Sequence, residues 1–366
     1  MGMRWLAAGL AVALWMGGAL EAGAAGGGVD VHMHLTFPLL EKQHAKRNKG
    51  GTPPGDAESV VRELLGMMDA AGVDKAIVMP PPQVREQTLQ QKKPASTLEL
   101  ADAVKQFPGR LALGGGGDTL NGMIHGLDAS AVAGADRAAF EKEAARLAAM
   151  GVKVFGEMSV LHLSMNEQHV FEEVSPEHPL FLLLADCSAK YGIPVDVHME
   201  AVPRDLPLPQ GLMRASSRNP EVVRANVSAF QRLLMHNPDA RFVWQHIGWD
   251  NIGHMTVELL DALLESNPNL YMALRVEART QRIGGGGPMP NRIVDEQGRV
   301  KPEWFALFQK YPDRFVIGSD EFIGGIGGKS ASPQSFDETW AMLRQLPPDL
   351  AAKIGRENAI RIYNLR

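Results

Sequence analysis

Short apolar runs alternate along the chain with longer stretches in which apolar residues recur at helical spacing. Eight runs rich in Val, Ile, Leu and Phe have the length of buried strands, at residues 29–35, 75–79, 110–113, 151–155, 194–198, 241–246, 269–276 and 314–318. Between them the pattern predicts amphipathic helices, for example over 57–71, 137–150, 220–236 and 255–266. Eight alternating βα units predict an α/β fold of the (β/α)8 TIM-barrel class, in a single domain.

The first residues carry a different pattern. Arg4 precedes an uncharged stretch over 5–20 that is rich in Ala, Leu and Gly, and Ala22-Gly23-Ala24 follows it. This arrangement predicts a secretory signal peptide over residues 1–24, with the barrel over 25–366. An uncleaved anchor is the alternative, although the apolar stretch is short for a full membrane span. We expect a secreted, periplasmic protein without membrane contact once the signal is removed.

Charge and cysteine content narrow the function classes. The 366 residues hold 37 basic and 42 acidic side chains, scattered along the chain, for a net charge of -5. This balance argues against a nucleic-acid-binding protein, so we expect a small-molecule substrate, with a homodimer as the default assembly. The single cysteine, Cys187, lies in an apolar run that indicates a buried helix face, and a lone cysteine excludes an intrachain disulfide.

Polar residues that can bind a metal stand at the ends of five predicted strands. They are His32 and His34 on the first strand, Glu157 after the fourth, His198 on the fifth, His246 on the sixth and Asp320 after the eighth. Because the carboxyl ends of barrel strands converge on one rim, these side chains are expected to meet there. Imidazole and carboxylate ligands suit a divalent metal, most readily zinc and also manganese or iron. A structural zinc site would more often use cysteine thiolates, which this chain lacks.

With these residues the chain resembles the amidohydrolase superfamily, in the branch of aminocarboxymuconate semialdehyde decarboxylase and related lactone hydrolases. The resemblance extends to the C-terminal segment over 357–365, which is similar to that branch's closing helix. It implies that His32, His34, His198 and Asp320 are metal ligands. It also implies that His246 either binds a second metal or polarises the substrate and shuttles protons, and we assign the catalytic base to Asp320.

Glu157 bears on whether one or two ions are expected. The segment Gly156-Glu157-Met158-Ser159 is similar to the strand-four Gly-Glu segment of TatD-like metal hydrolases, in which a carboxylate bridges two cations. We therefore treat Glu157 as a metal ligand, with a supporting role next to the ligands as the alternative. Lys153 either pairs with a carboxylate, Glu157 or Asp30, or carries a carbamate bridge. We expect Asp30 to project with the two histidines and to orient an imidazole.

Two residues are candidates for substrate binding. Arg275, near the end of the seventh strand, could clamp a substrate carboxylate, and its alternative is an ion pair with Glu277 or another acid. Trp249, just after His246, either walls the pocket or packs within its loop. The remaining histidines lack ligand spacing, so we expect surface or lid positions for them.

The function that these features predict is a metal-dependent hydrolase for a small amide, lactone or carboxylic-acid substrate. A metal-activated water would be the nucleophile. The alternative is a metal-dependent decarboxylase of a muconate-type or aromatic acid, because near relatives with the same histidine and aspartate pattern are lyases. A scaffold without catalysis would be expected to break at least one ligand position, and none is broken.

Overall fold

The computed structural model describes residues 27–37, 57–83, 95–167, 169–277, 289–324 and 333–365. The predicted signal peptide over 1–24 therefore lies outside the described residues. Among those that are described, no helix combines the length and the apolar character needed to cross a membrane.

The strands form one mainly parallel sheet in the order β3-β2-β1-β12-β11-β10-β7-β5-β4. The strands of this path are β1 (Gly28–Leu35), β2 (Val73–Val78), β3 (Leu111–Leu113), β4 (Gly115–Gly116), β5 (Phe155–His162), β7 (Val195–Met199), β10 (Phe242–Ile247), β11 (Leu270–Leu274) and β12 (Phe315–Ile317). Two short strands pair beside this path, β6 (Glu172–Glu173) with β5 and β13 (Glu321–Ile323) with β1, and β8 (Leu206–Pro207) pairs with β9 (Val222–Val223) apart from it.

The two ends of this path belong to one stretch of chain, because only Gly114 separates β3 from β4. The Gly114 N–H donates to Val78 O of β2 at 2.9 Å, and the Gly115 N–H donates to Val154 O at 3.1 Å. A Cβ on Gly114 would lie 2.7 Å from Cβ of Met79, so this crossing needs a glycine. The sheet thereby closes on itself at eight strand positions, and the predicted (β/α)8 barrel is confirmed.

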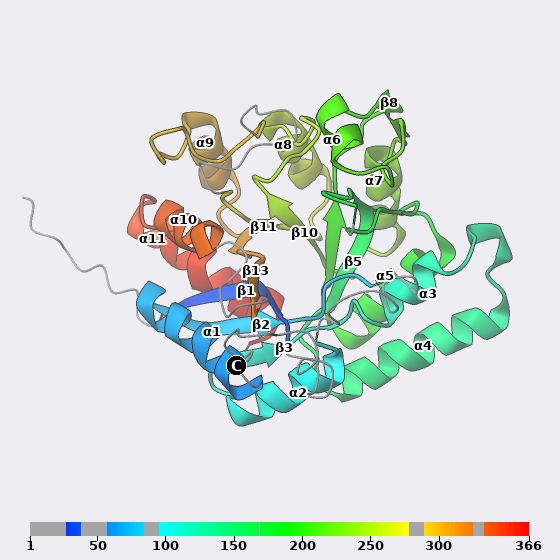
Figure 1. The fold of residues 1–366 in the computed structure, drawn as a ribbon, viewed down its shortest axis with the longest axis horizontal. Coiled ribbons are helices and arrows are strands. Elements are labelled where there is room, and N and C mark those ends of the chain that lie inside the picture. The colour runs from blue at the N-terminus through cyan, green and yellow to red at the C-terminus, as the bar shows by residue number, and fades with distance from the viewer. Residues whose placement is uncertain are drawn as a thin grey trace, which may run out of the picture.

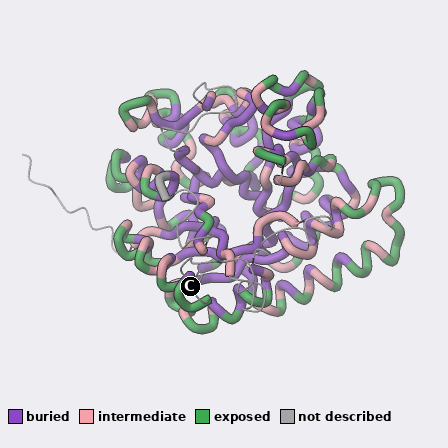
Figure 2. Tube along the Cα trace, in the orientation of Figure 1, coloured by how far each residue is buried: buried purple, intermediate pink, exposed green. Residues whose placement is uncertain are grey.

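Helices surround this ring (Figure 1). They are α1 (Ala57–Ala71), α2 (Thr97–Gln106), α3 (Leu120–His125), α4 (Gly134–Ala149), α5 (Pro179–Tyr191), α6 (Gln210–Ala215), α7 (Val227–His236), α8 (Val257–Ser266), α9 (Pro302–Lys310), α10 (Pro333–Leu343), α11 (Pro348–Ala352) and α12 (Asn358–Ile362). Figure 2 shows buried residues along the central strands and exposed residues on the outer helices. The apolar faces of the helices therefore pack inward onto the sheet.

Two of the predicted elements needed correction. The fourth strand was expected over 151–155, but β5 begins at Phe155 and runs to His162. Glu157 interrupts the apolar pattern there, so the sequence made the strand appear to end where it begins. The helix expected over 220–236 starts only at Val227, because Val222–Val223 pairs as β9 with β8.

The C-terminal segment closes the amino end of the barrel. Ile362, Tyr363 and Leu365 belong to the same buried cluster as Val29 and Val31 of β1. The expected closing helix is confirmed as α12, which a π-helical turn over Lys353–Glu357 precedes. This end of the barrel is therefore a packed apolar plug.

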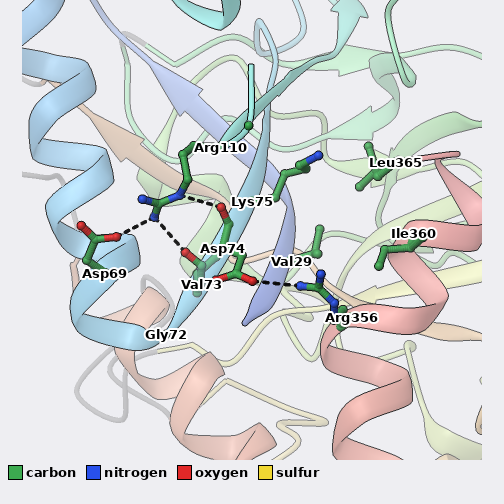
Figure 3. Close-up of a pocket in the computed structure, with 11 residues that line it drawn as sticks. Val29, Asp69, Gly72, Val73, Asp74, Lys75, Arg110, Arg356, Ile360 and Leu365 are labelled. Atoms are coloured by element: carbon green, nitrogen blue, oxygen red, sulfur yellow. Dashed lines mark hydrogen bonds and ion pairs between the residues drawn. The ribbon is translucent and has the colours of Figure 1, made fainter. Parts of the chain in front are cut away.

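A pocket of about 470 Å³ lies outside the plug, at the amino ends of β1 and β2 (Figure 3). Ion pairs cross it: Arg110 Nη2 donates to Asp69 Oδ1 at 2.6 Å, and Arg356 Nη1 donates to Asp74 Oδ2 at 3.1 Å. The predicted metal ligands lie toward the other end of the strands, so this pocket belongs to the face that serves stability in such barrels.

Asn358 connects α12 to the barrel and is buried. Its Nδ2 donates to the carbonyl oxygens of Pro312 and Phe315, each at 2.8 Å. Asn358→Ala removes a hydrogen bond from each of the two carbonyls, so we expect the free energy of unfolding to fall by about 2 kcal/mol in denaturant titration. Glu357→Ala, at an exposed position one residue earlier, is the control, and an equally small effect of both substitutions would contradict the anchoring role.

Candidate metal centre

The two histidines of β1 face the carboxyl end of the barrel, but Asp30 does not face it with them. Asp30 accepts hydrogen bonds from the Ser319 N–H at 3.1 Å and from Trp340 Nε1 of α10 at 3.3 Å. The pairing of β1 with β2 shifts register between Asp30 and Met33, which breaks the strict alternation of sides. The expectation that Asp30 projects with the histidines and orients an imidazole was therefore wrong.

The contacts of His32 and His34 leave their Nε2 atoms facing each other. His34 Nδ1 lies 2.8 Å from Met79 O, and because a carbonyl only accepts, this nitrogen carries the proton. His32 Nδ1 lies 3.5 Å from Asp196 Oδ2, which favours a proton there as well. The two Nε2 atoms are 3.0 Å apart. Neutral imidazoles in these tautomers would direct two lone pairs at one point, an arrangement that suits a shared cation.

Glu157 lies between two pairs of histidines, although its side chain is almost fully buried. Its Oε2 is 3.5 Å from the Nε2 atoms of both His32 and His34. Its Oε1 is 2.9 Å from His198 Nδ1 and 2.8 Å from His246 Nε2. One carboxylate thus presents one oxygen to each pair.

The electrostatics of this cluster follow from burial and from these contacts. Burial opposes charge on Glu157, yet His32 and the hydrogen bonds from His198 and His246 hold the pKa of this carboxyl well below its usual range. Burial likewise opposes charge on His32, but Glu157 raises the pKa of that imidazole to about 10. Burial lowers the pKa of His246 to about 4. The cluster therefore keeps a carboxylate that attracts positive charge.

Asp320 completes the cluster from the segment after β12. Its Oδ1 lies 3.2 Å from His34 Nε2 and 3.8 Å from His32 Nε2. Asp320 has a φ of 55° and His246 a φ of 62°, in the left-handed region that side-chain-bearing residues rarely adopt. Such backbone is held only where the surroundings over-determine it, and it is common at functional sites.

Arg275 is engaged by Asp320 and by an aromatic ring. Its Nη1 donates to Asp320 Oδ2, its Nη2 lies 3.7 Å from Glu277 Oε2, and its Cζ lies 3.7 Å above the ring of Trp249. Of the two interpretations from the sequence, the contacts favour the ion pair with an acid over the clamp for a substrate carboxylate. Trp249 supports this guanidinium as a cation–π partner.

The donor atoms fall into three overlapping groups that could each hold an ion, within each of which they lie within 4.8 Å of one another. The groups are His32, His34 and Glu157; His32, His246 and Asp320; and Glu157, His198 and His246. All six residues expected at the rim thus come together. His198 joins through Glu157 and His246, whereas the resemblance grouped it with His32, His34 and Asp320. Nitrogen and carboxylate donors with unshared lone pairs fit a divalent cation.

Comparison with known families gives a match over most of the chain. The profile of the family described as amidohydrolase matches residues 29–365. The chain belongs to the amidohydrolase family. It is therefore an enzyme of the amidohydrolase type. Members of this family bind divalent metal ions.

Solved structures are similar to this amidohydrolase at low identity, and two of the three that follow have a TM-score of at least 0.50. A probable 2-pyrone-4,6-dicarboxylic acid hydrolase from Acinetobacter baumannii, with citric acid bound, has a TM-score of 0.52 and 12% identity over 92% of this chain and 99% of that chain. A 4-oxalomesaconate hydratase from Rhodopseudomonas palustris has a TM-score of 0.50 and 12% identity over 92% and 96%. A 5-carboxyvanillate decarboxylase from Novosphingobium aromaticivorans, complexed with manganese, has a TM-score of 0.47 and 15% identity over 94% and 97%. No curated protein matches the chain.

Asp196 is a residue of this amidohydrolase site that the sequence analysis missed. Its Oδ2 faces His32 Nδ1, and its Oδ1 accepts a hydrogen bond from the Tyr363 hydroxyl at 2.9 Å. Asp196 therefore has the imidazole-orienting place that we expected for Asp30. Asp196 could have been found from the sequence by its position two residues before His198, because alternate residues of a strand share a face.

Two histidines that the sequence analysis set aside also lie next to the cluster. The His162 ring centroid lies 4.7 Å from that of His198 and 4.5 Å from that of His169. Burial lowers the pKa of His162 to about 4 and that of His169 to about 3, so both rings are neutral near pH 7. The sequence analysis could not place them near the cluster, because it ended the fourth strand at residue 155 and β5 extends to His162.

Lys153 takes neither role expected from the sequence. Its Nζ donates to Asn364 O at 3.2 Å, in the C-terminal segment that closes the amino end of the barrel. It is therefore neither an ion-pair partner of Glu157 or Asp30 nor a bridging ligand between cations.

The place of Asp196 can be tested through metal affinity. Asp196→Asn keeps the size of the side chain but removes the charge that holds the His32 tautomer, so we expect affinity for divalent metal to fall by about 10–100-fold. Competition with a chelator measures this affinity. Asp186→Asn, at an exposed position on α5, is the control, and equal affinity of both variants would contradict the role of Asp196.

Proposed function

We propose that this enzyme is a metal-dependent hydrolase of a small amide, lactone or carboxylic-acid substrate, with two divalent cations, zinc before manganese or iron. The position of Glu157 carries the proposal. A carboxylate that offers one oxygen to His32 and His34 and the other to His198 and His246 is suited to bridge two cations. Export to the periplasm, proposed from residues 1–24, suits a reaction that needs water as its only co-substrate.

Residues of the chain supply the two half-sites and the base. His32 and His34 would hold one cation, His198 and His246 the other, with Glu157 between them. When bound, a divalent cation lowers the pKa of a water molecule toward neutrality and polarises a substrate carbonyl. Asp320 is the base: Arg275 occupies its Oδ2, which leaves Oδ1 on the side of the two β1 imidazoles.

Hydrolysis then needs one proton relay. The water oxygen forms a bond to the carbonyl carbon, and Asp320 Oδ1 accepts the proton that the water loses. The carbonyl carbon next loses its bond to the amide nitrogen or lactone oxygen, and the same proton passes to that leaving group. The ion pair with Arg275 keeps Asp320 oriented through both steps, because it fixes the other carboxylate oxygen.

Labelled water distinguishes hydrolysis from the alternative decarboxylation. We expect metal-loaded enzyme in H2¹⁸O to incorporate the label into the acid product of one member of a panel of lactones and amides. Asp320→Asn should lose nearly all of this turnover while its circular dichroism is unchanged. Release of carbon dioxide from an aromatic or muconate-type acid, without any hydrolysis, would instead establish the lyase.

A further inference from the structure

Arg292 belongs to the segment that links β11 to α9, on the same end of the barrel as the metal centre. Its two neighbours in sequence hold this segment against the loop after β10. Asn291 Nδ2 donates to Asp250 Oδ2 at 2.6 Å. A Cβ on Gly248 would lie 2.6 Å from Ile293 Cδ1 and 2.5 Å from Arg275 O, so the three residues are in close contact. Arg292 therefore lies between two residues that are packed against the loop that contains Gly248 and Asp250.

Two of the three guanidinium nitrogens of Arg292 are buried without a partner. The residue is 6% exposed, and neither Nε nor Nη2 has a hydrogen-bond partner. Within the described ranges, no carboxylate forms an ion pair with it. A guanidinium keeps its proton at every pH of interest, so this charge cannot be relieved by deprotonation. A buried charge without a counter-charge is costly, and such a group is typically matched by an anion.

Three other buried or partly buried arginines of the described residues have hydrogen-bond partners for their guanidinium groups. Arg314 Nε donates to Leu270 O at 2.7 Å, and Arg241 Nη1 donates to Ile362 O at 2.6 Å. Arg275 is held by Asp320 and Trp249. Among the described residues, Arg241 and Arg314 are thus paired with carbonyl oxygens and Arg275 with a carboxylate, and Nε is the only nitrogen of Arg275 that is buried without a partner.

The two unpaired atoms also have a meaningful geometry. The Nε–H and the adjacent Nη2–H form one edge of the planar guanidinium, and their two parallel donors match the two oxygens of a carboxylate. A single nitrogen left unpaired would carry no such preference.

We propose that Arg292 anchors a carboxylate of the substrate, at a point separate from the bond that is hydrolysed. This assignment rests on the proposed function, and it narrows the substrate class to amides or lactones that carry a free carboxylate. Arg275 is already committed to Asp320, so Arg292 takes the recognition role that the sequence had suggested for Arg275.

Ligand binding tests the proposal without turnover, so failure to find hydrolysis leaves the test intact. The probes are glutarate, its uncharged analogue glutaramide and inorganic phosphate, titrated by calorimetry into metal-loaded enzyme. We expect glutarate to bind and Arg292→Met to weaken it by about 10–100-fold, as for a charged hydrogen-bonded pair. Arg292→Lys should restore only part of the affinity, since it returns the charge without the fork. Glutaramide should not bind.

The control is Arg299→Met, in the same segment, whose guanidinium is exposed and pairs with Asp295. It should bind glutarate as the wild type does. Without ligand, Arg292→Met should melt at or above the wild-type temperature, because it removes an unmatched buried charge. A clear drop in melting temperature with glutarate binding retained would show a structural arginine and overturn the proposal. Equal binding of phosphate, or no binding of glutarate to the wild type, would overturn it too.

Discussion

The site of this amidohydrolase depends on one buried carboxylate, that of Glu157, among four imidazoles. Its Oε2 faces the two imidazoles of β1, and its Oε1 faces one imidazole of β7 and one of β10. Burial of such a charge is tolerable only because each oxygen has partners. The same burial strengthens its attraction for cations, since little water screens it. Protein stability and metal binding therefore both depend on positively charged or hydrogen-bonding partners at the two oxygens of Glu157.

Around Glu157, further contacts connect the candidate metal ligands to the barrel. Asp196 connects His32 to Tyr363, and Tyr363 belongs to the apolar plug at the other end of the strands. Asp320 is connected through Arg275 to the ring of Trp249. The positions of the candidate site residues are thus fixed by the core and by one loop, which is the kind of preorganisation that catalysis by a polar site requires.

Local patterns predicted the parts of the structure that obey a strict period. The helix over 57–71 was bounded correctly because its apolar stripe is regular, and the spacing of His32 and His34 placed both on one face. Predictions from the apolar and polar pattern were wrong where the backbone departs from the regular helix or strand repeat. A shift in register after Asp30 turned it away from the histidines, and Glu157 obscured the start of β5. Asp196 could have been found from its position two residues before His198, whereas the place of His162 followed only from a tertiary contact. The unpaired state of Arg292 is a property of its whole surroundings, which no spacing encodes.

The measurement that tests the role of Glu157 most directly is the metal content per chain, by elemental analysis, of wild type and Glu157→Gln purified without added metal. The amide keeps the size of the side chain but cannot bridge two cations as a carboxylate does. If Glu157 bridges two cations, we expect about two equivalents of divalent metal in the wild type, falling to one or fewer in the variant. About one equivalent in both proteins would contradict it and make Glu157 a support for a single metal ion.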